Sequence, residues 1–326
     1  MKSKKSLVSI VCVTYNHENF IRKAIDGFLM QKTIFPFEII IYDDASTDKT
    51  TEIVKSYEEQ HSDLVVANIQ AENQYSKGIK PMTYMYQKAC GKYIAICDGD
   101  DYWIDPYKIQ KQVDFLESNP DCSWCFHPAK IEYFDAKRAN YEERPKKIPK
   151  NSKFTAKDVI LGGGGFFATA SAMFRSYVMN DLPDWFFRAP VGDFPLALIA
   201  SSKGNAGYID DVMCVYRKNV PGSWSLKRPD WKKKLYFIEE TEKYLWKFNV
   251  YSFSRFEKIL KVKIIKNRYN LLLFAIFRPN LLNNLFEWIK SFKNSGILYN
   301  LRDYLILIYV FANMSLMYAA RKISRY

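Results

Sequence analysis

The sequence predicts an α/β fold, in which a doubly wound, mostly parallel sheet with flanking helices is followed by a C-terminal helical region. Three observations support this prediction. Short apolar runs alternate with stretches of helical periodicity over the first hundred residues, and polar loops follow the apolar runs. The excess of basic residues is confined to the last hundred residues. The chain therefore has two parts of different character.

Four short apolar runs predict buried strands, at residues 7–13, 37–42, 64–69 and 93–97. The segments between them carry apolar residues at helical spacing and predict helices at residues 19–31, 46–59 and 81–89. Each helical segment is long enough to connect parallel neighbours. In such sheets the ligand lies at the carboxyl ends of the strands, so the loops that follow these runs are the candidate site.

The most acidic of these loops is Asp98-Gly99-Asp100-Asp101, directly after the fourth apolar run. Carboxylates this close repel one another unless a positive charge lies between them. A divalent cation that holds a diphosphate would supply that charge, because hard oxygen ligands suit Mg²⁺ and Mn²⁺. The alternative is a solvated acidic turn that caps a helix beginning near Pro106.

Two further loops belong to the same sheet edge. Thr14-Tyr15-Asn16 follows the first strand, and Asp43-Asp44 follows the second. Neither G-x-G-x-x-G nor G-x-x-x-x-G-K-[ST] is present. The sequence therefore disfavours a dinucleotide site of the Rossmann type and a P-loop.

The combination of these loops resembles the family 2 glycosyltransferases, which are inverting, nucleotide-sugar-dependent enzymes with the GT-A fold. The motifs that carry the resemblance are Val13–Asn16, Glu38–Asp48 and Asp98–Trp103, each at the end of a predicted strand. The resemblance covers roughly residues 6–225. It predicts a catalytic domain at residues 1–225, with residues 226–326 as a separate helical region, and it implies a UDP-sugar donor.

The donor's nucleotide is expected against the first two loops. Tyr15 offers an aromatic face on which uracil can stack. The resemblance assigns the imide N–H of uracil to Asp44, and it places Thr14, Asn16 and Gly99 around the donor. Lys77 lies on the same edge and would reach the base or a phosphate; its alternative is an exposed loop lysine.

The resemblance also assigns the groups around the diphosphate. Asp98 would contact the ribose or the donor sugar, and Asp100 would coordinate Mn²⁺ or Mg²⁺. Related enzymes often carry a histidine where this chain has Asn219, which puts a third protein ligand in doubt. Arg217 would neutralise the diphosphate instead.

An inverting transfer needs a base for the acceptor hydroxyl. The resemblance assigns this role to Asp193, at the start of a predicted helix; the alternative role of Asp193 is a helix N-cap. Gly162–Gly165 would pass close to the donor sugar and acceptor, or form a plain flexible loop. Trp185 and Trp224 suit sugar rings and suit a core equally well.

The charge of the chain is divided unevenly. Residues 1–225 hold 28 Lys and Arg against 28 Asp and Glu, whereas residues 226–326 hold 20 against 7. Residues 304–320 carry no charge. They predict a helix in an anionic membrane interface, with a packed helical subdomain and a spanning helix as alternatives. No motif for nucleic-acid binding accompanies the charge.

Together with the basic C-terminal region, the resemblance implies an enzyme on the inner face of the cytoplasmic membrane, acting on a lipid-linked glycan in surface polysaccharide assembly. The six cysteines lack a framework spacing and are expected as reduced thiols. Two other functions stay open: a metal-dependent nucleotidyltransferase and a non-catalytic membrane-associated binding module. The first should have a glycine-rich or basic loop after the first strand, and the second has no need to keep Asp98, Asp100 and Asp193 together.

Overall fold

The computed structural model describes residues 6–80, 86, 88–134, 142–144, 148–223, 230–276, 287–288 and 290–291. The chain forms two compact units. The first contains Met1–Arg228 and Tyr244–Leu260, and the second contains Pro229–Lys243 and Lys261–Tyr326. The segment 244–260 therefore belongs with the unit that carries the candidate site.

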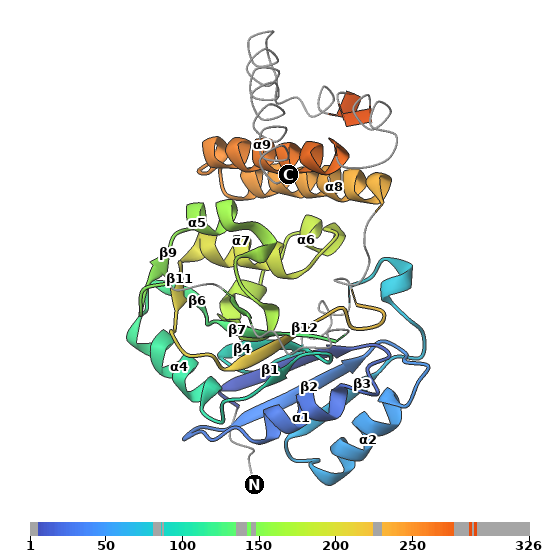
Figure 1. Cartoon of the computed structure of the whole chain (residues 1–326). Coiled ribbons are helices and arrows are strands. Elements are labelled where there is room, and N and C mark those ends of the chain that lie inside the picture. Colours follow the sequence, from blue (N-terminus) through green and yellow to red (C-terminus); the bar gives the residue numbers. More distant parts are fainter. Residues whose placement is uncertain are drawn as a thin grey trace, which may run out of the picture. The chain divides into compact units, whose positions relative to one another are not determined.

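An eight-stranded sheet with the order β3-β2-β1-β4-β10-β6-β11-β9 forms the centre of the first unit (Figure 1). Four parallel strands come from the N-terminal part: β1 (Val8–Thr14), β2 (Phe37–Asp43), β3 (Val65–Ile69) and β4 (Tyr93–Asp98). The others are β6 (Cys122–Phe126), β9 (Lys153–Phe154), β10 (Met173–Arg175) and β11 (Asn205–Tyr208). Strand β10 runs antiparallel to both β4 and β6, so the sheet is mixed.

A smaller sheet has the order β5-β12-β7-β8. Its strands are β5 (Tyr102–Trp103), β7 (Ala129–Tyr133), β8 (Glu142–Arg144) and β12 (Cys214–Lys218). Strand β5 begins directly after the acidic loop and pairs with β12. This pairing brings Arg217, far along the chain, to the acidic loop.

Helices flank the sheets in the first unit. They are α1 (Ile21–Leu29), α2 (Thr50–Gln60), α4 (Lys108–Ser118), α5 (Ala156–Gly162), α6 (Asp184–Arg188) and α7 (Asp193–Lys203). Helices α1 and α2 lie side by side against the β1–β3 part of the sheet (Figure 1). The apolar face of α1 packs with β1 and β2 in one core, through residues such as Ile25, Phe28, Ile10 and Ile41. Burial of such side chains is the main stabilising contribution.

The structure confirms the predicted fold class and each of the four predicted strands to within one residue at either end. The first two predicted helices are also present, although α2 begins at Thr50 with Lys49 at its N-cap position. Asp48 binds the first turn of α2 by accepting the N–H of Thr50 at 2.9 Å. Most of the predicted helix at 81–89 lies outside the described residues.

The second unit contains most of the helices α8 (Trp231–Tyr251) and α9 (Glu257–Ile276). A buried ion pair joins them, in which Arg268 donates from Nε and Nη2 to the two carboxylate oxygens of Glu242, both at 2.5 Å. The predicted C-terminal helical region is thus present. Across the ranges that are described, no helix is both long and apolar enough to cross a membrane. The uncharged run 304–320 lies outside those ranges.

Candidate functional site

The strand order reverses at β1, and the candidate site lies at that point. Strand β1 pairs with β2 on one side and with β4 on the other, and Val13 is opposite Asp98. The Gly99 N–H donates to the Val13 carbonyl at 2.8 Å, and the Asp44 N–H donates to the Thr14 carbonyl at 3.1 Å. All three predicted loops therefore meet at one edge, as the strand pattern predicted.

The acidic loop approaches the end of β1 too closely for a side chain at position 99. A Cβ at Gly99 would lie 2.7 Å from Thr14 Oγ1 and 3.0 Å from His17 Nδ1. Thr14 is buried, and its hydroxyl lies 3.1 Å from His17 Nδ1. The close packing of the acidic loop against Thr14 and His17 therefore requires glycine at position 99.

The pKa values of two carboxyl groups in this loop are raised. Burial, and then the charges of Asp100 and Asp193, raise the pKa of Asp98 to about 7. Burial, Asp100 and Asp98 raise the pKa of Asp101 well above its usual range. A bound cation would relieve this repulsion. The charge of Asp193 thus also contributes to the raised pKa of Asp98, and a common site for Asp193 and the acidic loop stays a prediction.

Arg217 supports the acidic loop. Its backbone N–H donates to Asp101 Oδ1 at 2.8 Å, and its Nη1 donates to the Asp100 carbonyl at 2.8 Å. Nε donates to Glu132, and the guanidinium lies 4.3 Å from the Tyr102 ring centre. Arg217 is only 7% exposed. The predicted contact with a diphosphate stays a prediction; what the structure adds is that Arg217 holds the loop that carries Asp100.

Asp193 is the first residue of α7, preceded by the N-cap residue Gly192. Its Oδ1 accepts the Phe194 N–H at 2.7 Å. Burial raises the pKa of Asp193 above its usual value, although Lys80 and Thr169 act in the opposite direction. A raised pKa suits a general base, because proton transfer is most effective when the pKa lies near the working pH.

Lys80 was not singled out from the sequence, yet it holds the loop that leads to Asp193. Its Nζ donates to the carbonyl oxygens of Val191 at 2.6 Å and Phe186 at 3.3 Å. Burial lowers its pKa to about 8. Because 111 residues separate Lys80 from Val191, no local pattern could have revealed this contact.

Tyr216 is a second residue that the sequence analysis missed. Burial, followed by the charges of Asp101 and Asp100, raises the pKa of its phenol. The raised pKa keeps the phenol protonated over a wider pH range. The alternation of β12 gave no reason to prefer Tyr216 over its neighbours.

The loops predicted to hold the nucleotide are well ordered by their own hydrogen bonds. Tyr15 is 42% exposed, so its ring is accessible. Asp44 is buried, and its two oxygens accept the N–H groups of Gln74 and Tyr75 at 2.8 and 3.0 Å. Recognition of uracil by Asp44 stays a prediction, and the carboxylate would have to accept that bond in addition to these two.

Three other residues of this region have partners within the loops at this edge of the sheet or directly after it. Asn16 accepts the Thr47 N–H at 2.8 Å. Asp43 accepts hydrogen bonds from Ser46 and Thr51 and so braces its own loop. The predicted donor contact Lys77 forms an exposed ion pair with Glu72. Contact of Lys77 with a base or a phosphate stays a prediction.

Aromatic side chains near the site are largely part of the core. Trp185 is buried and stacks on Tyr244 with ring centres 6.4 Å apart, so a sugar-binding role for its face is not supported by its packing. Trp224 lies outside the described residues. In the glycine-rich segment, a Cβ at Gly165 would meet nothing within 4 Å. Gly165 therefore borders open space, whereas a Cβ at Gly162 would overlap the Phe166 ring.

The residues present fit a metal that shares its ligands with a nucleotide. In the part of the chain that the structure describes, no three His, Cys, Asp or Glu side chains are grouped to hold a metal ion alone. Mg²⁺ is usually bound by one or two carboxylates plus substrate phosphates, and the crowded carboxylates of the acidic loop suit that arrangement. Asn219, where a third ligand was in doubt, adopts a left-handed backbone conformation with φ of 60°.

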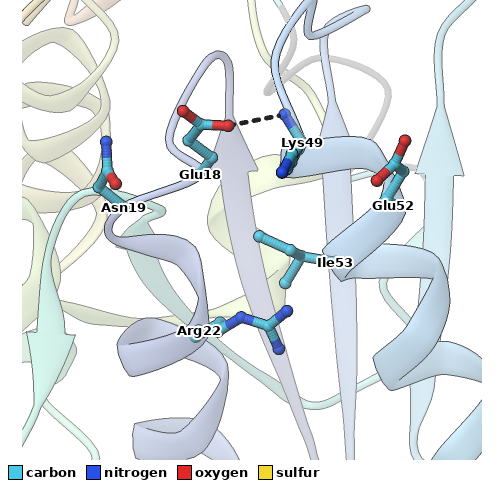
Figure 2. Close-up of a pocket in the computed structure, with 6 residues that line it drawn as sticks. All are labelled: Glu18, Asn19, Arg22, Lys49, Glu52 and Ile53. Carbon is cyan, nitrogen blue, oxygen red and sulfur yellow. Dashed lines mark hydrogen bonds between the residues drawn. The ribbon is translucent and has the colours of Figure 1, made fainter.

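A pocket of about 430 Å³ lies between the first turns of α1 and α2 (Figure 2). Glu18 Oε2 accepts the backbone N–H of Lys49 across it at 3.0 Å. The other lining residues are Asn19, Arg22, Glu52 and Ile53. Its two basic and two acidic side chains balance, and none of the predicted site residues lines it, so it is separate from the candidate site.

The fold places the chain in the class of α/β proteins that bind ligands where the strand order reverses. The model of glycosyl transferase family 2 matches residues 9–182, and the chain belongs to this family. An uncharacterized protein of Mycobacterium tuberculosis is 34% identical over 238 residues, which is 69% of this chain and 63% of the relative. The chain thus spans less than two thirds of that relative's length.

Two further comparisons concern characterised proteins. An Escherichia coli protein named UDP-Glc:alpha-D-GlcNAc-diphosphoundecaprenol beta-1,3-glucosyltransferase is 37% identical over 113 residues, covering 34% of this chain and 42% of that protein. The structure of S. aureus TarS 1-349 with UDP-GlcNAc has a TM-score of 0.63 at 16% identity, covering 87% of this chain and 81% of that TarS 1-349 chain. The structural likeness confirms the predicted GT-A fold.

Proposed function

We propose that the protein is an inverting glycosyltransferase, which moves a sugar from a UDP-sugar to a lipid-linked glycan in surface polysaccharide assembly. One observation carries the proposal: the three predicted loops meet at one edge of the sheet, where the Gly99 N–H donates to the Val13 carbonyl and the Asp44 N–H donates to the Thr14 carbonyl. Family membership and the nucleotide-sugar bound to TarS support a nucleotide-sugar donor.

The residues suit a single displacement. The acceptor oxygen attacks the anomeric carbon from the face opposite the diphosphate, while Asp193 takes the hydroxyl proton. The bond between the anomeric carbon and the phosphate oxygen breaks, and UDP leaves with the bonding electrons. Burial raises the pKa of Asp193, and Lys80 holds the loop just before it, which prepares the carboxylate for this role.

Asp100 and the phosphates would hold the metal. When bound, Mn²⁺ or Mg²⁺ supplies positive charge that offsets the charge of the departing diphosphate. Arg217 keeps the Asp100 backbone in place, and the absence of a side chain at Gly99 lets the loop lie against Thr14. Asp98 would contact the ribose or the sugar.

The lipid-linked acceptor is supported by the E. coli relative, whose name specifies a diphosphoundecaprenol acceptor. The excess of 20 basic over 7 acidic residues beyond position 225 supports peripheral contact with the inner face of the cytoplasmic membrane. Sugar and linkage would follow from the shape of the loops around Gly165 and before Asp193.

Turnover with a panel of UDP-sugars and undecaprenyl-diphosphate sugars tests the proposal. We expect release of UDP and a product of inverted anomeric configuration. Asp193→Asn should lower kcat by about 10²- to 10⁴-fold and leave UDP affinity unchanged, since general-base catalysis contributes about that much. Release of pyrophosphate from nucleoside triphosphates would favour a nucleotidyltransferase. Full turnover by Asp193→Asn would refute the assignment of the base.

A further inference from the structure

The turn between α8 and α9 presents apolar side chains within a basic surface. Val250 and Phe253 are 76% and 89% exposed. Over residues 244–260, all in the first unit, the other exposed side chains are Lys247, Ser254, Arg255 and Lys258. No acidic side chain is exposed in this segment. We call Lys247, Val250, Phe253, Arg255 and Lys258 the basic tip.

The backbone conformation of the turn makes a phenylalanine at position 253 unfavourable for folding stability. The Ser254 N–H donates to the Asn249 carbonyl at 2.8 Å and the Phe253 N–H donates to the Val250 carbonyl at 3.0 Å, which is the Schellman pattern of a helix C-terminus. Phe253 occupies the position after the cap with φ of 54°. Glycine normally occupies this left-handed position, because a side chain there is strained. Folding stability alone does not favour an exposed aromatic residue here.

The turn is held in this shape by its neighbours. Phe256 stacks on Phe248 with ring centres 5.9 Å apart and an angle of 4°. Arg255 Nη2 donates to the Ser202 carbonyl at 3.0 Å, which fixes the turn to the end of α7. Phe253 stays exposed beside these contacts. The apolar side chains are therefore presented by a rigid support, which avoids an ordering cost on docking.

We infer that the basic tip docks on a bilayer that contains anionic lipid, with Phe253 and Val250 in the interface and the basic side chains at the headgroups. Aromatic and aliphatic side chains flanked by lysine and arginine are suited to such an interface. A two-fold contact with a second copy would place basic side chains against themselves, which is unfavourable. This inference deepens the proposed function, on which it rests for a membrane-bound acceptor.

Sedimentation of the full chain with vesicles tests the inference, using phosphatidylcholine with or without phosphatidylglycerol. Phe253→Gly is the informative variant, because glycine suits the left-handed position. We expect its partition to anionic vesicles to fall about tenfold while its melting temperature stays the same or rises. Ile34→Ser is the matched control, since Ile34 is 93% exposed in another loop. It should bind as the wild type does.

A second pair of variants tests the charge. Lys247→Gln with Lys258→Gln should weaken binding by about fivefold per lysine and reduce its dependence on salt. Lys55→Gln with Lys157→Gln removes two other exposed lysines of the first unit and should change binding little.

Two results would overturn the inference. One is vesicle binding by Phe253→Gly and by the Lys247/Lys258 double variant at the wild-type level, which would place docking elsewhere on the chain. The other is wild-type protein that does not bind vesicles but forms a dimer, while Phe253→Gly stays monomeric. The basic tip would then bind a second copy of the chain. UDP affinity, measured on the same samples, tests the proposed function separately, because vesicle binding requires neither donor nor acceptor.

Discussion

Lys80 Nζ lies 2.6 Å from the carbonyl oxygen of Val191, two residues before Asp193. It also reaches the Phe186 carbonyl, so one cation ties both ends of the segment between α6 and α7. The segment that carries Lys80 is in turn anchored near the nucleotide loop, because Asp44 accepts the N–H groups of Gln74 and Tyr75. The proposed donor and acceptor sides are thus connected through residues 74–80.

Replacing Lys80 should reduce kcat more than donor binding. Lys80→Met removes both hydrogen bonds to the loop, and a misplaced base lowers the rate by about 10- to 100-fold. Lys80→Arg keeps a donor and should recover part of the loss. Steady-state kinetics gives kcat and KM for each variant. Lys55→Met is the control, because Lys55 is exposed and is not among the predicted site residues. A loss confined to KM in Lys80→Met would contradict a positioning role.

The pH dependence of turnover should show the effect of Lys80 on the pKa of Asp193. Burial raises the pKa of Asp193, so kcat/KM should fall with decreasing pH at a higher pH than for an ordinary aspartate. The charge of Lys80 favours the carboxylate and lowers this pKa. Lys80→Met should therefore move the acidic limb to higher pH. If the acidic limb of the kcat/KM profile lay at the same pH in Lys80→Met and in the wild type, the charge of Lys80 would have no effect on the pKa of Asp193.

A methyl group at Gly99 should disturb the acidic loop. The added Cβ would lie 2.7 Å from Thr14 Oγ1, so Gly99→Ala should lower the free energy of unfolding by about 1–3 kcal/mol and weaken UDP binding. Gly165→Ala adds the same group where nothing lies within 4 Å and is the control. Thermal unfolding and calorimetry measure both effects. Equal behaviour of the two variants would show that the close approach is unimportant.

Arginine at position 217 should not be replaceable by lysine. A lysine cannot donate to both the Asp100 carbonyl and Glu132, as Nη1 and Nε do. We expect Arg217→Lys to lose about 2 kcal/mol of stability, equivalent to about 4–8 °C in melting temperature. The exposed Arg188 provides the control Arg188→Lys. If Arg217→Lys lost UDP affinity without losing stability, direct contact with the diphosphate would be the better account.

Much of the fold could be predicted from the sequence because parallel strands buried on both faces are short apolar runs. Such runs mark β1 to β4, and the polar residues directly after them mark the sheet edge. The acidic loop was identifiable for the same reason, since its carboxylates are adjacent in the chain. The helices α8 and α9 followed from periodicity, but the association of residues 244–260 with the first unit did not.

Contacts between distant segments could not be predicted. The sequence showed that Arg217 was cationic near the site, but its partners Asp100 and Glu132 lie 117 and 85 positions away. Trp185 suited a sugar or a core equally until its stacking on Tyr244 was known. A sequence pattern identifies the chemical type of a side chain. The neighbours that this side chain contacts depend on tertiary packing.

The most direct test of the central claim is calorimetric titration of UDP into the full chain, first with Mn²⁺ and then with EDTA, alongside CDP and GDP. We predict binding that is selective for UDP and weaker without metal, because in the proposed site the acidic loop and the phosphates would share the cation. Absence of binding to every diphosphate, in a folded protein with Mn²⁺ present, would contradict the proposed donor site and favour a non-catalytic binding module.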